Sequence, residues 1–165
     1  MKLVKYVILA VISVALLAGS SFAEIKNEKT IGLMLGDPIA VTIKVPVKEK
    51  TFLNIHSGIW TWSFWHDIDY DTPFLSVDYA FLFPVKKTFF YVGAGVAVFF
   101  ADNPKDDNNY DAAAAVRLPV GIELYSKDKF SLGFEIAPIY QVLPAYSHKP
   151  YILELNGGLL INYSF

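Results

Sequence analysis

Charged residues interrupt otherwise apolar stretches of this chain, and each stands on a strand face whose other positions are small or polar. They are Lys44, Asp78, Arg117, Glu123, Glu135 and Glu154, with His56 on the same kind of face. Alternate residues of a strand share a face, so these groups would point into the interior of a closed sheet. Carboxylates enclosed there must pair with cations or take up protons. We therefore predict a polar network filling a narrow lumen, with Arg117 bridging two of the glutamates; a gated ion path is the alternative interpretation.

A second acidic group, Asp67, Asp69 and Asp71, has the spacing that opens an EF-hand calcium loop. The rest of that pattern is missing, because Thr72 stands where glycine is required and the twelfth position is Asp78, which we assign to the interior. We interpret the segment as a solvated acidic loop, and we predict no metal site and no cofactor.

Histidines are the remaining candidates for catalysis. A hydrolase or acyl-transfer site would need His56, His66 or His148 within hydrogen-bond reach of a nucleophile. Apart from neighbouring serines there is no such nucleophile, and alternation sends His56 and Ser57 to opposite faces of one strand. We therefore predict that the protein is not an enzyme.

Strands with alternating apolar residues must hold these groups. The clearest is 151–165, where the alternation runs to the terminal Phe165. The same period of two recurs at 30–36, 39–46, 52–62, 74–83, 89–100, 112–124 and 131–142. Pro119 and Gly121 argue against a helix over the alanine run at 112–115. The pattern predicts an all-β fold, an eight-stranded antiparallel up-and-down transmembrane barrel over residues 24–165.

Residues 1–23 have the pattern of a cleavable signal peptide. Lys2 and Lys5 give a positive start, an apolar run follows at 7–18, and Ser21-Phe22-Ala23 forms a cleavage site. A spanning anchor is the alternative, but the apolar run is shorter than the roughly 20 residues that a spanning helix needs. Removal of the two lysines changes the formal charge from −2 to −4, which does not suit nucleic-acid binding. The sequence has no cysteine for disulfides.

Short and long connections alternate along the chain. Lysine-bearing turns are expected at 47–51, 84–88 and 125–129, and longer connections at 63–72, 101–111 and 143–150. Aromatic residues gather near the strand ends, and we expect two girdles at the membrane interfaces. One would contain Trp60, Trp62 and Trp65, and the other Phe81, Phe83, Phe89, Phe90, Tyr163 and Phe165.

With these features, nearly the whole mature chain resembles the small eight-stranded outer-membrane barrels of the OmpX and OmpA transmembrane-domain type. Within that group, four segments resemble a family of uncharacterised bacterial barrels: Gly36-Asp37-Pro38, Trp62-Ser63-Phe64, Leu118-Pro119-Val120-Gly121-Ile122-Glu123 and Glu135-Ile136-Ala137-Pro138. The resemblance implies an outer-membrane location with both termini in the periplasm. It also implies that Tyr163 and Phe165 form a signal read by the barrel-assembly machinery.

The resemblance implies a non-enzymatic role, either structural or in surface interaction through the external loops 63–72 and 101–111. The expected partners are outer-membrane lipid and lipopolysaccharide, which the acidic loop would reach through divalent cations; the external ligand is open. A soluble lipocalin-like barrel that binds an apolar ligand is the alternative, and it requires apolar residues inside and charges outside. A lipid A-modifying enzyme and a small pore are weaker alternatives.

Overall fold

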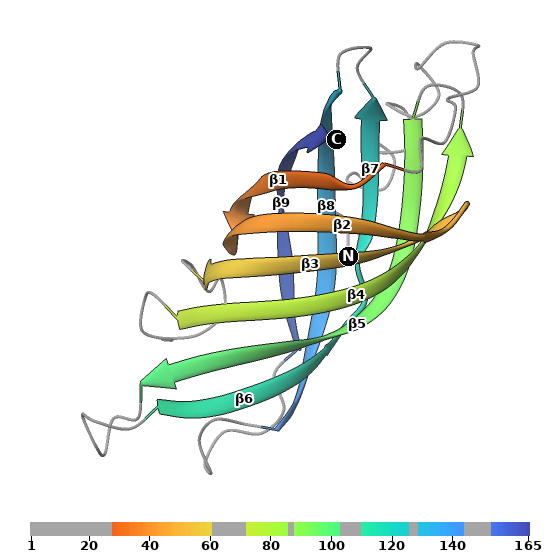
Figure 1. The fold of residues 1–165 in the computed structure, drawn as a ribbon. Helices are drawn as coiled ribbons and strands as arrows, with labels where there is room; N and C mark the ends of the chain where they lie inside the picture. The colour runs from red at the N-terminus through yellow and green to blue at the C-terminus, as the bar shows by residue number, and fades with distance from the viewer. Residues whose placement is uncertain (1–27, 61–71, 86–87, 103–109, 126–128, 144–152) are drawn as a thin grey trace, which may run out of the picture.

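All regular structure in the described part of the chain is antiparallel strand. The computed structural model describes residues 28–60, 72–85, 88–102, 110–125, 129–143 and 153–165. Figure 1 shows the strands: β1 (Thr30–Asp37), β2 (Ile39–Lys48), β3 (Thr51–Trp60), β4 (Thr72–Val85), β5 (Thr88–Asp102), β6 (Tyr110–Arg117), β7 (Val120–Tyr125), β8 (Phe130–Leu143) and β9 (Leu153–Ser164). Among these residues no helix is long and apolar enough to cross a bilayer.

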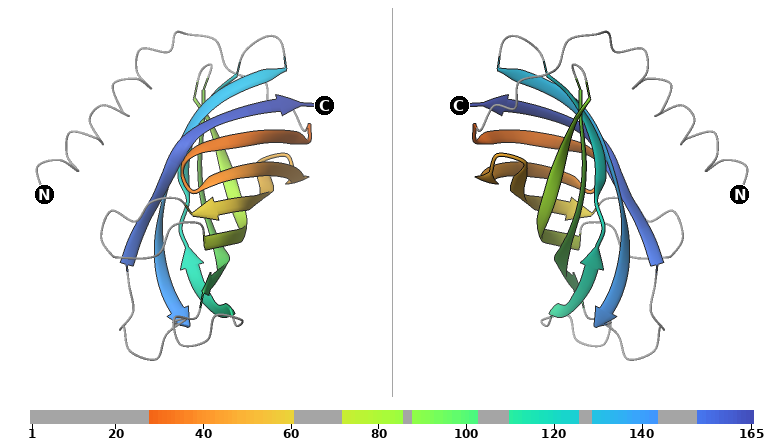
Figure 2. Two further views of the ribbon diagram at one scale, coloured as in Figure 1. Left: turned by 90° about the vertical axis from the view of Figure 1, so that its left-hand side faces the viewer. Right: turned by 90° about the vertical axis from the view of Figure 1, so that its right-hand side faces the viewer.

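The sheet closes into a ring. Consecutive strands pair with each other, except β6 and β7, and β9 pairs with β1 at the seam, where Figure 2 shows the two strands side by side. Strands β6 and β7 share one place in the ring, because both pair with β5 on one side and with β8 on the other. The ring therefore has eight strand positions, which confirms the predicted up-and-down barrel.

A break separates β6 from β7 at Leu118 and Pro119, within the single strand predicted at 112–124. Proline has no N–H to donate to a strand ladder, which explains the interruption. The Leu118 amide donates to the Pro138 carbonyl at 3.0 Å, and the Gly93 amide donates to the Pro119 carbonyl at 2.8 Å. The wall thus stays joined on both sides of the break.

The strands are staggered, so that a line of hydrogen-bonded partners spirals around the lumen. Figure 1 shows β1 to β3 running across the view while β8 and β9 stand upright, as strand tilt in a closed barrel requires. Starting from Thr30, the partners in order are Lys44, Asn54, Asp78, Gly95, Arg117, Ile139 and Glu154. This series, the polar register line, reaches β9 ten residues from Ser164, the direct β9 partner of Thr30. Most of its members are polar, and all of them belong to the inward face.

The two faces of the sheet have opposite chemistry, as the alternation predicted. Most outward side chains are aliphatic or aromatic, with Ser57 on β3 as an exception; Leu33, Val41, Val77, Val96 and Leu132 are among those exposed. Inward positions carry small, polar and charged residues that are almost fully buried. Charges therefore lie inside the ring and apolar surface lies outside it.

Aromatic residues also line the interior, and two of them correct the girdle prediction. Trp60 and Phe89 are buried inside and do not lie on the outer wall. Each lies an even number of residues from the inward-facing residues of its strand and therefore faces inward as well. Phe81, Phe83, Tyr163 and Phe165 are exposed outside, as expected of a girdle, whereas Trp62 and Trp65 lie outside the described residues.

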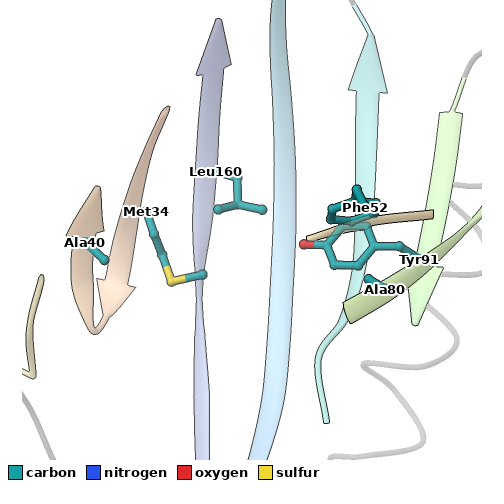
Figure 3. Close-up of a cluster of buried hydrophobic side chains, with 6 residues drawn as sticks. All are labelled: Met34, Ala40, Phe52, Ala80, Tyr91 and Leu160. Carbon is teal, nitrogen blue, oxygen red and sulfur yellow. The ribbon is translucent and has the colours of Figure 1, made fainter. Parts of the chain in front are cut away.

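Two apolar clusters pack inside the barrel against the polar residues of the lumen. One comprises Trp60, Phe74, Ala97, Ala115 and Ile139, with Phe99 packed against it, at the end of the barrel where segments 61–71 and 103–109 leave the strands. The other comprises Met34, Ala40, Phe52, Ala80, Tyr91 and Leu160. Figure 3 shows the Tyr91 ring beside Phe52, with its hydroxyl directed toward β8. The polar groups that contact these clusters are the candidate site.

Candidate functional site: a polar network inside the barrel

Arg117 on β6 occupies the centre of the network. One guanidinium nitrogen, Nη1, donates to Asp78 Oδ2 and, at 3.1 Å, to Ser76 Oγ, both on β4. The other, Nη2, donates to Glu135 Oε1 on β8. All three charged side chains are completely buried. The guanidinium thus joins three strands across the lumen through charge-assisted hydrogen bonds, the stronger kind.

Glu135 collects further donors. The Tyr91 hydroxyl on β5 donates to Glu135 Oε2 at 2.6 Å, and Asn54 Nδ2 on β3 donates to the same oxygen at 3.4 Å. His56 Nε2 lies 3.5 Å from Glu135 Oε1 and 3.6 Å from Asp78 Oδ2. Asn54 Nδ2 is 2.8 Å from His56 Nε2. Strands β3, β4, β5, β6 and β8 therefore meet at this carboxylate or beside it.

A second ion pair lies between β2 and β7. Lys44 Nζ is 2.5 Å from Glu123 Oε2 and lies over the rings of Phe52 and Tyr91 at 5.4 and 5.0 Å. Glu123 Oε1 accepts from Ser131 Oγ at 2.5 Å and from Asn162 Nδ2 at 2.6 Å. This ammonium is therefore held by both charge and aromatic faces.

Glycines make room for the large groups of the network. A Cβ on Gly121 would lie 2.2 Å from Tyr91 Cζ, so the bare backbone of β7 lets the ring lie flat against the wall. A Cβ on Gly95 would meet Asp78 Oδ1 at 2.2 Å. The small residues of the inward face thus have a packing role, because they accommodate the side chains that cross the lumen.

The structure brings together five of the six residues predicted for the network. Lys44, Asp78, Arg117, Glu123 and Glu135 lie inside and are connected as described. Glu154 faces inward as predicted but lies near the start of β9, half-buried and within electrostatic reach of Asp37, and its Oε1 has no hydrogen-bond partner among the described residues. It is therefore not part of the network.

Arg117 does not bridge two glutamates; it bridges an aspartate and a glutamate. Only Gly95 separates Asp78 from Arg117 on the polar register line, so the aspartate is the nearer carboxyl, while Glu123 pairs with Lys44. Uncharged side chains also belong to the network, which the sequence alone did not predict; they are Thr42, Asn54, Ser76, Tyr91, Ser131 and Asn162. Parity places all of them inside, but the register that selects their partners is not visible in one sequence.

The hydrogen bonds and ion pairs of the network connect strands across the lumen. They also place the charges inside the barrel, whereas a lipocalin-like barrel has its charges outside. An apolar outer wall around an ionic lumen does not favour the soluble ligand-binding alternative. Within the described ranges, no group of three or more histidine, aspartate or glutamate side chains has a geometry suited to a metal ion.

Other predicted features fall outside the described residues. They are the signal peptide 1–23, the aspartates of the EF-hand-like segment, His66, His148, and most of the loops 63–72 and 101–111. Tyr163 and Phe165 are exposed at the end of β9; the Tyr163 ring packs on Phe130 at 5.1 Å, and the Phe165 amide donates to the Lys29 carbonyl at 3.0 Å. Their role in assembly stays a prediction.

Comparisons with known proteins agree with the barrel. The crystal structure of the N-terminal β-barrel domain of Pseudomonas aeruginosa OprF is similar, with a TM-score of 0.59, 18% identity, and coverage of 84% of this chain and 94% of that domain. At this identity the likeness supports the fold. A search of curated proteins gave no match. A family model described as "Protein of unknown function (DUF3996)" matches residues 22–158, and the chain therefore belongs to that family.

Proposed function

We propose that this protein is an outer-membrane β-barrel without enzymatic activity, and that its lumen is closed by the polar network. The observation that carries the proposal is the separation of the two faces: the closed ring has an apolar outer wall, and its buried charges are inside. A charged side chain facing lipid costs about 2–4 kcal/mol at the bilayer midplane, so this arrangement suits a hydrocarbon environment. The barrel fold shared with the OprF domain supports the proposal.

The proposed orientation places the described chain ends in the periplasm. Thr30 pairs with Ser164, so β1 begins where β9 ends. The connections at this end are short, and three longer ones leave the other end, where β1 and β2 are the exception because Pro38 alone joins them. In outer-membrane barrels the short turns are periplasmic and the long loops are external. On this basis loops 63–72 and 101–111 face the exterior and provide the structural or surface-interaction role, next to outer-membrane lipid and lipopolysaccharide.

Cell fractionation combined with unheated gel electrophoresis tests the proposal. We expect the protein in the outer-membrane fraction, dispersed only in detergent, and migrating differently before and after boiling. A protein that stays monodisperse in detergent-free buffer would contradict the proposal and favour the soluble lipocalin-like alternative.

Two further measurements address the role. Planar-bilayer recording should show no conductance steps, because the ionic network and the buried clusters packed against it fill the lumen; regular steps would favour the small-pore alternative. For surface interaction, the intact barrel and a variant shortened in both long loops should differ in what they capture from extracellular material. Equal capture by both forms would assign the binding to another part of the protein.

A further inference from the structure

The enclosed charges of the barrel do not balance. Among the described residues, the charged side chains with at most 5% exposure are two cations, Lys44 and Arg117, and three carboxyls, Asp78, Glu123 and Glu135. An enclosed charge without a counter-charge is strongly unfavourable and is commonly relieved by proton uptake. The network therefore requires one additional proton.

Hydrogen-bond donors are shared unequally among the three carboxyls. Glu123 and Glu135 each have three, namely Lys44, Ser131 and Asn162 on Glu123, and Arg117, Tyr91 and Asn54 on Glu135. Within the described part of the chain, Asp78 accepts from Arg117 alone, through Oδ2, and its buried Oδ1 has no partner. Multiple donors favour the ionised form of a carboxyl, and burial without them favours the neutral acid. Asp78 is therefore the carboxyl best suited to be neutral.

His56 is the other group that could carry the proton, and its contacts argue against this. Asn54 Nδ2 donates to Glu135 and presents its second hydrogen to His56 Nε2 at 2.8 Å, so this ring nitrogen acts as an acceptor. Burial disfavours a positive charge on the ring, and Arg117 and Lys44 also oppose it, whereas Glu135 favours it. The neutral imidazole fits this site.

We propose that the lumen binds one proton at neutral pH and that Asp78 carries it on Oδ1. The ion pairs Lys44–Glu123 and Arg117–Glu135 then balance, and the neutral acid still accepts from Arg117 through Oδ2. The titratable and charged groups of the enclosed network come from β2, β3, β5, β6, β7 and β8: Lys44, His56, Tyr91, Arg117, Glu123 and Glu135. Of these, Arg117 donates to Asp78, His56 Nε2 lies 3.6 Å from its Oδ2, and Glu135 acts on it electrostatically. On β1 and β9 the buried neighbours of this network are uncharged, namely Thr30, Met34, Asn156, Leu160 and Asn162.

The bound proton couples folding to pH. In the unfolded chain Asp78 is solvated and ionised at neutral pH, so folding takes up a proton there. Stability then falls as the pH rises, since the unfolded state binds fewer protons than the folded state. Loss of the proton in alkaline solution leaves one negative charge uncompensated in the lumen, which provides a pH-sensitive element inside an otherwise fixed wall.

Infrared spectroscopy of the mature barrel, folded in detergent with carboxyl-labelled aspartate, tests the proposal directly. At neutral pH we expect one protonated-acid C=O band that shifts with the label and disappears on alkaline titration. An aspartate in contact with solvent is ionised at neutral pH and contributes only carboxylate bands. The absence of a labelled acid band in the wild-type barrel would overturn the proposal, and this measurement requires no variant.

Two matched variants sharpen the test. Asp78→Asn reproduces the shape of the neutral acid and needs no proton on folding, so we expect it to lose the labelled band, to unfold at neutral pH at a midpoint no lower than that of the wild type, and to lose the decline of stability with rising pH. Glu135→Gln removes the counter-charge of Arg117, so Asp78 must ionise and the band must vanish although Asp78 is present. A clearly lower midpoint or failure to fold for Asp78→Asn, or a retained band in Glu135→Gln, contradicts the assignment.

Discussion

Removal of the Lys44 charge tests how the ionic network contributes to stability. In Lys44→Met the side chain keeps its apolar contacts with Phe52 and Tyr91, but Glu123 loses the ammonium that lies 2.5 Å from its Oε2. Glu123 is 2% exposed, so solvent cannot replace the lost charge, and only Ser131 and Asn162 remain as donors. Removing one partner of a buried pair costs about 3–5 kcal/mol, and we expect a loss of this size.

The double variant Lys44→Met with Glu123→Gln separates charge from packing. The glutamine side chain is uncharged and can still accept from Ser131 Oγ, so the lumen contains no unpaired carboxylate at this position. Replacing both members of a buried pair is often close to neutral, and we expect the double variant to recover most of the lost stability, to within about 1–2 kcal/mol of wild type.

Denaturant unfolding of the barrel in lipid vesicles, followed by the fraction that resists unfolding on unheated gels, measures both effects. A loss of about 3–5 kcal/mol changes the unfolding equilibrium constant by roughly two to four orders of magnitude, which is readily resolved. The reasoning is refuted if the single variant is as stable as wild type, or if the double variant is no more stable than the single one.

Three other changes test separate parts of the structure. Arg117→Leu removes the link between β4 and β8, and we expect a loss of about 3–5 kcal/mol, seen as a lower unfolding temperature of the detergent-resistant form; equal heat stability would disprove the link. Gly121→Ala places a methyl group in the Tyr91 ring, and we expect a cost of about 1–3 kcal/mol by denaturant titration, whereas an unchanged midpoint would show that the ring moves freely. Val96→Arg puts a charge on the outer wall at a position 58% exposed, and folding into vesicles should weaken by about 2–4 kcal/mol; unimpaired folding would mean that this face does not meet lipid.

The strands and their faces could be predicted because the underlying signal is local. A period of two is visible in each stretch by itself, and it places residues such as Asp78 and Arg117 inside without knowledge of any neighbour. The break at Pro119 needed only the missing amide of proline, but alternation continues across it, so the sequence indicated one strand where there are two.

The partners inside the lumen depend on information that is not local. The pairing of Arg117 with Asp78 and Glu135 follows from the stagger of the ring, which results from all the strand registers together. For Glu154, the alternation correctly indicates an inward-facing side chain. It does not indicate how far along the barrel that side chain lies from the network. Trp60 was assigned to a girdle by residue type and position near a strand end, whereas its parity with His56 sends it inward.

The seam between β1 and β9 means that the ring is completed by the two strands that are farthest apart in the chain. A chain truncated before Leu153 would leave β1 and β8 with unpaired backbone edges, which hydrocarbon does not tolerate. Closure must therefore wait until synthesis of the last strand, and incomplete chains should be substrates for quality-control proteases. Because Thr30 and Ser164 are direct partners, a short linker could join the ends, and a circular permutant opened at one of the external loops should close the same ring.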